Sequence, residues 1–218
     1  MKATWLLVGL MAPAAFAQVP AASDPVIQVD FSNPGLSPSQ WTMTMRPDGS
    51  GHFRSQTGKA QGGASEIGTP GVDRDIQLSP GFAKRVFDVA RRHKWFNEDC
   101  ESHLKVAFQG WKTMTYTGPQ GHGACTFNFS KNKEIQDLGD SMTAVAQTIL
   151  EGARLETLLQ HDRLGLDAEM EYLSEAAADG RAQQICAIRE ILERLAGDDD
   201  VLERVRKRAK ALLEYGTI

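Results

Sequence analysis

The residues whose types and spacing most clearly predict chemistry are two of the three cysteines, Cys100 and Cys125. They flank a segment with strand-like alternation, so an antiparallel meander there could bring them near each other. In an exported chain such a pair oxidises, and a disulfide closing a loop of about 25 residues contributes roughly 3 kcal/mol. The alternative is a pair of buried thiols. The third cysteine, Cys186, lies beside Ile185 in an apolar helix and is expected to be a small buried side chain, or a thiol that links dimers if it is exposed.

Residues 1–17 predict the export that this disulfide requires. Lys2 precedes an apolar stretch, and Ala15-Phe16-Ala17 fits a small-x-small cleavage site, so we expect a signal peptide cleaved after Ala17. The stretch is shorter than the ~20 residues of a membrane span. The mature chain is therefore predicted to be secreted or periplasmic, without a transmembrane segment.

Catalysis by a thiol is the competing interpretation of Cys100, because His103 follows it closely. Asp99 and Glu101 flank the cysteine, and nearby negative charges raise the pKa of a thiol, which disfavours the reactive thiolate. A cysteine in a disulfide also cannot act as a nucleophile, so the bond is the favoured prediction.

Three polar residues near glycine-containing turns are the remaining candidates for a catalytic site: Asp48, His52 and His122. The segment 48–51 contains a serine between two glycines, as a catalytic serine loop does. A catalytic serine elbow joins a strand to a helix, whereas this segment has strand patterns on both sides, so a hairpin turn explains its residues. The five histidines have no metal-ligand spacing. The sequence therefore predicts no metal and no cofactor.

The charge balance indicates which partners to expect. The chain has 24 basic and 28 acidic residues, a net charge of −4, which argues against nucleic-acid binding. A basic run over residues 204–210 follows the acidic residues 198–200, an order that the dipole of one helix favours. The run is therefore interpreted as structural, and the expected partner is a protein.

Turn residues and periodicity divide the first half of the chain. Residues 18–40 are rich in Pro and Ser and are predicted to be a linker, in which 26–31 could pair as a short strand. Residues 41–45 and 50–56 alternate as a hairpin. A glycine-rich loop over 57–71 precedes a possible strand at 73–78, and Ser79-Pro80 predicts the start of a helix that ends near His93.

The second half repeats strands followed by a helix. Alternation predicts a meander of strands over 104–108, 111–117 and 125–129. Apolar residues then recur every three or four positions from about Asn132 to Ala153, which is typical of a long amphipathic helix. Three shorter helices follow: one from the cap Asp167 to Asp179 with Gly180 as its stop, one over 181–196, and one that begins at 198–200.

These elements predict an α+β fold, in which an antiparallel sheet of five or six strands packs on two helices and a C-terminal all-helical unit covers one end. The expected division is an α+β domain over 41–163 and a helical unit over 166–218. The predicted core comprises the residues on the inner faces of these elements: Trp41, Met43, Phe53, Phe82, Val86, Val106, Phe108, Phe127, Met142, Val145 and Ile149.

Three functions remain open at this point. The leading hypothesis is a non-catalytic secreted or periplasmic module that binds another protein. The alternatives are an envelope hydrolase with a site near the hairpin turns and a structural envelope protein that self-associates. Four aromatic residues could either line a carbohydrate or peptide groove or fill the interface between sheet and helices: Trp41, Trp95, Trp111 and Tyr116.

Overall fold

The computed structural model describes residues 24–58 and 68–215. The predicted signal peptide with its cleavage site and residues 59–67 of the glycine-rich loop lie outside these ranges. The flanks of that loop are joined, because the Gly58 amide donates to the Thr69 carbonyl at 2.8 Å.

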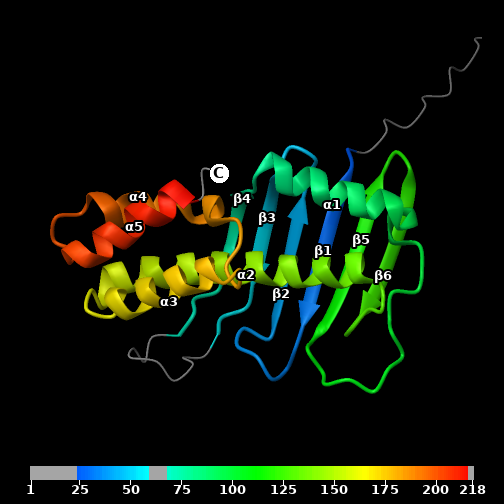
Figure 1. Ribbon diagram of the computed structural model, residues 1–218, viewed down its shortest axis with the longest axis horizontal. Coiled ribbons are helices and arrows are strands. Elements are labelled where there is room, and N and C mark those ends of the chain that lie inside the picture. Colours follow the sequence, from blue (N-terminus) through cyan, green and yellow to red (C-terminus); the bar gives the residue numbers. More distant parts are fainter. Residues whose placement is uncertain (1–23, 59–67, 216–218) are drawn as a thin grey trace, which may run out of the picture.

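A six-stranded antiparallel sheet forms the body of the molecule, with the strand order β4-β3-β2-β1-β5-β6 (Figure 1). This arrangement confirms the predicted α+β fold. The strands are β1 (Val26–Ser32), β2 (Gln40–Met45), β3 (Ser50–Ser55), β4 (Asp73–Gln77), β5 (Trp111–Gly118) and β6 (Gly121–Phe127).

Strand β1 lies inside the predicted linker and occupies the middle of the sheet. It pairs with β2 on one side and with β5 on the other. Its side chains alternate, so that Ile27, Val29 and Phe31 are buried while the residues between them lie on the opposite face. The strand therefore joins the hairpin of the first half to that of the second.

Two helices cover one face of this sheet, α1 (Pro80–Arg92) and α2 (Lys133–His161) (Figure 1). α1 begins at the predicted Ser79 cap, and α2 begins near the predicted position and is capped by Asn132. The Ser79 hydroxyl accepts from the Phe82 amide at 3.2 Å, and the Asn132 side chain accepts from the Glu134 amide at 3.0 Å. The apolar sides of the helices pack on the buried face of the sheet, and none of the described helices covers its other face.

The predicted strand over 104–108 is wrong, and so is the burial predicted for Val106 and Phe108. Residues 97–110 have no regular secondary structure, and both side chains are exposed. β5 already pairs with β1 and β6, and the short helix η1 (Lys94–Phe96) packs on one face of β6, where a Cβ on Gly123 would lie 2.3 Å from the Trp95 carbonyl oxygen. β6 is an edge strand, but the segment 104–108 does not pair with it. Its backbone bonds elsewhere: the Val106 amide donates to the Leu104 carbonyl at 3.0 Å, and the Ala107 carbonyl accepts from the Asn128 side chain at 3.2 Å.

The C-terminal unit consists of the end of α2 with α3 (Leu166–Ala178), the short helix η2 (Ile185–Ile188), α4 (Arg189–Gly197) and α5 (Glu203–Tyr215). Its core is separate from that of the sheet and is built from aliphatic residues such as Leu158, Met170, Leu192 and Val205. Within the described ranges of the chain, no helix is long and apolar enough to cross a membrane.

Three helix boundaries in this unit differ from the prediction. Asp167 is not the cap of α3, which begins after Gly165, and α5 begins at Glu203 rather than at 198–200. The predicted helix over 181–196 is interrupted by Gln184, whose φ is +56°. Tertiary contacts hold this break, because the Gln184 side chain accepts from the Ser79 amide at 2.8 Å and the Gln183 amide donates to the Thr148 hydroxyl at 3.0 Å.

Candidate functional site

The predicted disulfide is confirmed and lies at the start of the irregular segment before β5. Cys100 and Cys125 are joined with an S–S distance of 2.08 Å and a Cα–Cα distance of 5.7 Å, and both residues are buried. Cys186 does not share this site. It is partly exposed, which corrects the predicted full burial, and desolvation raises the pKa of its thiol.

The segment between the disulfide and β5, residues 99–110, is called the 99–110 loop here. It runs beside β6 and then across the ends of β6 and β5 (Figure 1). The side chain of Asn128, which is buried, accepts from the Gln109 amide at 2.6 Å and donates to the Ala107 carbonyl at 3.2 Å. The Ser102 amide donates to the Phe129 carbonyl at 2.8 Å. The loop is thus attached to the sheet at both of its ends.

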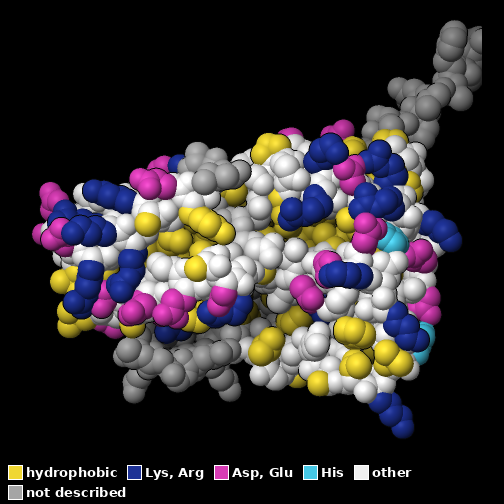
Figure 2. Space-filling view, in the orientation of Figure 1, with side chains coloured by type: hydrophobic (Ala, Val, Ile, Leu, Met, Phe, Trp, Pro, Cys, Tyr) yellow, Lys and Arg dark blue, Asp and Glu magenta, His cyan; other side chains and the backbone are white. Residues whose placement is uncertain are grey.

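This anchored loop carries large apolar side chains on its outside. Leu104, Val106 and Phe108 are 51%, 39% and 49% exposed, and Trp111 at the start of β5 is 45% exposed. We call these four residues the loop patch. Phe108 and Trp111 contact each other edge to face, with ring centroids 5.9 Å apart. Figure 2 shows hydrophobic side chains gathered where this loop lies in Figure 1.

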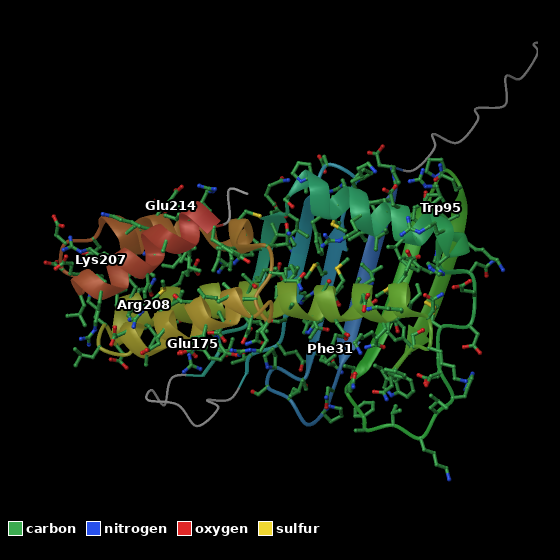
Figure 3. The ribbon with its side chains drawn as sticks, in the orientation of Figure 1. Phe31, Trp95, Glu175, Lys207, Arg208 and Glu214 are labelled. Carbon is green, nitrogen blue, oxygen red and sulfur yellow. A yellow bond between two sulfur atoms is a disulfide. The ribbon has the colours of Figure 1, made fainter. Side chains whose placement is uncertain are left out.

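The other aromatic candidates serve the core. Trp41 is buried and stacks on Phe31 with centroids 5.2 Å apart, and Trp95 stacks on the buried Tyr116 at 4.3 Å. Figure 3 places Trp95 and Phe31 at opposite ends of the sheet. Of the four aromatics that could have lined a groove, Trp111 is thus the exposed one.

A groove of about 690 Å³ lies beside the loop patch. Its floor is α2, from Asp137 to Gln147. One wall contains Gln109 and Lys112, and the other contains Tyr172 of α3 and Arg181 from the segment that follows α3.

Lys112 is the unusual residue of this groove, because it is a buried cation. It is 3% exposed, its Nζ donates to the Asn128 carbonyl at 3.1 Å, and it lies 5.3 Å from the centroid of the Phe127 ring. Desolvation lowers the pKa of this amine, and the carboxylates of Asp140 and Glu101 partly oppose that effect. Sequence reasoning missed this residue, although the strand alternation places it on the helix-facing side of β5.

The three residues considered for a hydrolase lie on the β2–β3 turn and on two separate strands. Asp48 accepts from the Ser50 hydroxyl at 2.7 Å, which lowers the pKa of its carboxyl group. His52 on β3 lies within 2.9 Å of both Asp75 and Asp73, which raise the pKa of its imidazole. His122 on β6 contacts the Thr117 hydroxyl at 3.2 Å. Three strands separate β3 from β6, about 19 Å at the usual spacing, so the two histidines do not meet.

The basic run on α5 is paired across the helical unit. Arg204 and Arg208 both bind the carboxylate of Asp167 on α3, at 2.6 and 2.7 Å. Lys207 pairs with Glu203 at 2.8 Å. Arg208 points from α5 toward α3 (Figure 3). Ion pairs with Asp167 on α3 thus account for Arg204 and Arg208, in addition to the helix dipole.

A buried carboxyl pair between α2 and α3 was also missed by sequence reasoning. Gln147 donates to one oxygen of Glu151 at 2.9 Å, while the other oxygen has no partner within the described chain. Arg154 lies 2.8 Å from Glu169 of α3. Desolvation, with the neighbouring Glu169 carboxylate, raises the pKa of Glu151 to about 8. The apolar residues on several sides of the second half of α2 were the available signal, since they indicate a helix enclosed on more than one face.

Among residues 24–58 and 68–215, no group of three or more His, Cys, Asp or Glu side chains is arranged to hold a metal ion. No protein-family model matches this sequence, and no curated protein is detectably similar to it. The function must therefore be argued from the loop patch and the groove.

Proposed function

We propose that this chain is an exported protein-binding module that engages its partner through the loop patch. The observation that carries the proposal is the outward placement of Leu104, Val106 and Phe108 on one anchored loop, together with the exposed Trp111 at the start of β5. Contiguous exposed apolar side chains are typical of interaction sites, and aromatic residues contribute a large share of the binding energy at interfaces.

The anchoring of the loop favours binding. A flexible loop loses conformational entropy when a partner orders it, at about 0.5–1.5 kcal/mol for each immobilised side chain. Here Asn128 and the disulfide hold the loop before a partner arrives. The buried disulfide and the predicted signal peptide together support export to an oxidising compartment.

Site-specific photocrosslinking in the native host tests this proposal. A benzophenone amino acid at position 108 should yield an adduct with another protein, which mass spectrometry identifies. The same probe at position 164 is the control, since Leu164 is 82% exposed but lies in the helical unit. An adduct of twice the chain mass would instead favour the self-associating structural protein, and equal labelling from both positions would contradict the proposal.

A further inference from the structure

We propose that the groove on α2 receives an extended segment of the partner polypeptide, with the main chain of that segment in the groove and its apolar side chains on the loop patch. This inference rests on the proposed function and adds the form in which the partner is recognised.

The groove and the loop patch are neighbours along the 99–110 loop. Gln109 lines the groove and immediately follows Phe108 of the loop patch. Lys112 also lines the groove, whereas Trp111, the residue before it in β5, points to the opposite side of the strand. A single ligand that lies across residues 108 and 109 contacts both surfaces.

The length of the groove suits a short extended peptide. Its floor includes Asp137, Asp140, Ala144 and Gln147, which recur every three or four residues and so share one side of α2. Ten residues of helix rise about 15 Å. An extended chain covers that distance with four or five residues at about 3.3 Å each.

The polar groups of the groove include hydrogen-bond donors without protein acceptors. The side chains of Gln109 and Ser141 make no hydrogen bond to the rest of the described chain. The Lys112 ammonium has three N–H groups, and one donates to the Asn128 carbonyl. These groups can donate to the carbonyl oxygens of a peptide backbone.

Acceptors lie on the floor of the same groove. The Asp140 carboxylate receives a hydrogen bond from Gln136 at 2.9 Å, and the Asp137 carboxylate pairs with the exposed Lys133 at 2.7 Å. Two carboxylates disfavour an anionic ligand, whereas peptide N–H groups can donate to them. On the far wall Arg181 is held by Asp179 at 2.7 Å and lies 5.3 Å from the centroid of the Tyr172 ring. The mixture of donors and acceptors matches the alternating C=O and N–H groups of an extended main chain.

An oligosaccharide also offers donors and acceptors, but the aliphatic side chains of Leu104 and Val106 beside the groove favour a polypeptide. Panning a displayed library of random linear peptides on the mature protein tests the inference. Enriched peptides should carry an aromatic or aliphatic residue, and resynthesised peptides should bind with affinities measurable by calorimetry.

Two matched variants locate the binding site. Ser141→Tyr fills the floor of the groove on α2 and should weaken peptide binding by at least about tenfold. Ser174→Tyr makes the same change on the partly exposed side of α3, outside the groove, and should change the affinity by less than about twofold. Far-UV circular dichroism establishes that both variants keep the fold.

The inference is overturned if no peptide is enriched, or if Ser141→Tyr and Ser174→Tyr bind the selected peptides equally well. It is also overturned if the wild type binds soluble glycan fragments and Ser141→Tyr weakens that binding but not the binding of peptides. If the photocrosslinked adduct at position 108 still forms in Ser141→Tyr, the loop patch still binds the partner. In that case the proposed function stands and only the role of the groove is rejected.

Discussion

Replacing Glu151 by glutamine should stabilise the fold at alkaline pH and leave it equally stable or somewhat less stable in acid. Glu151 is buried between α2 and α3, and one of its oxygens has no partner in the described chain. Burial and the nearby Glu169 carboxylate raise the pKa of Glu151 to about 8, so the folded protein keeps this carboxyl group protonated where the unfolded chain has lost the proton.

The sign follows from proton linkage. Between pH 4.5, the ordinary pKa of a glutamate, and pH 8 the folded state binds more protons at Glu151 than the unfolded state, so the free energy of unfolding falls as the pH rises. The difference between these two pKa values corresponds to a loss of about 5 kcal/mol. The glutamine amide cannot ionise, but it brings N–H groups that cost ~1–3 kcal/mol if they find no acceptor. We therefore expect Glu151→Gln to gain about 2–4 kcal/mol above pH 8.

Urea unfolding at pH 5 and at pH 8.5, followed by far-UV circular dichroism, measures this gain. Glu175→Gln is the matched control, because Glu175 is exposed on α3 (Figure 3) and forms no ion pair with another described residue. Relative to the wild type, Glu151→Gln should be about 2–4 kcal/mol more stable at pH 8.5 and equally stable or less stable at pH 5, whereas Glu175→Gln should stay close to the wild type at both. Parallel stabilities of the wild type and Glu151→Gln across this range would refute the reasoning.

Three further predictions concern the loop patch and its anchors. Phe108→Ser should remove the partner adduct formed by a probe placed at a neighbouring loop position, yet change the free energy of unfolding by less than about 1 kcal/mol, because this side chain is half exposed. The double variant Cys100→Ser/Cys125→Ser should lose roughly 3 kcal/mol in urea unfolding under oxidising conditions, and an unchanged midpoint would contradict a stabilising bond. Gly110→Ala should destabilise the protein by about 1–3 kcal/mol, since Gly110 has a φ of +112° and its added Cβ would lie 2.5 Å from the Phe31 ring; a thermal scan that matches the wild type would show that the loop adjusts at no cost.

The last three predictions are related, because they concern either the loop patch or the residues that anchor its loop. The disulfide and Gly110 hold the 99–110 loop in place. Asn128 links this loop to the groove, because its side chain accepts from the Gln109 amide and its backbone carbonyl accepts from the Lys112 ammonium. Changes to these anchors should therefore affect partner binding together with stability, whereas changes to the exposed side chains should affect binding alone.

Local patterns in the sequence determined most of the secondary structure. The Ser79 cap, the alternation of the first hairpin and the helical spacing of α2 depend on groups within a few residues of each other, and all are present in the structure. The disulfide between Cys100 and Cys125 was predicted correctly, although the first strand of the meander from which their proximity was argued does not form.

Tertiary structure alone decided which alternating segments become strands and which residues are enclosed. Residues 104–108 alternate as a strand does, but their backbone bonds to itself and to the Asn128 side chain instead of to a strand, and their apolar side chains face outward. Val26–Ser32 was expected at most as a short strand inside a linker, yet it lies at the centre of the sheet because two hairpins meet on it. Glu151 and Lys112 are buried only because distant segments pack over them. The periodicity of apolar residues indicates that a segment has an apolar and a polar face. Which face is buried depends on the strands and helices that pack against it in the folded protein.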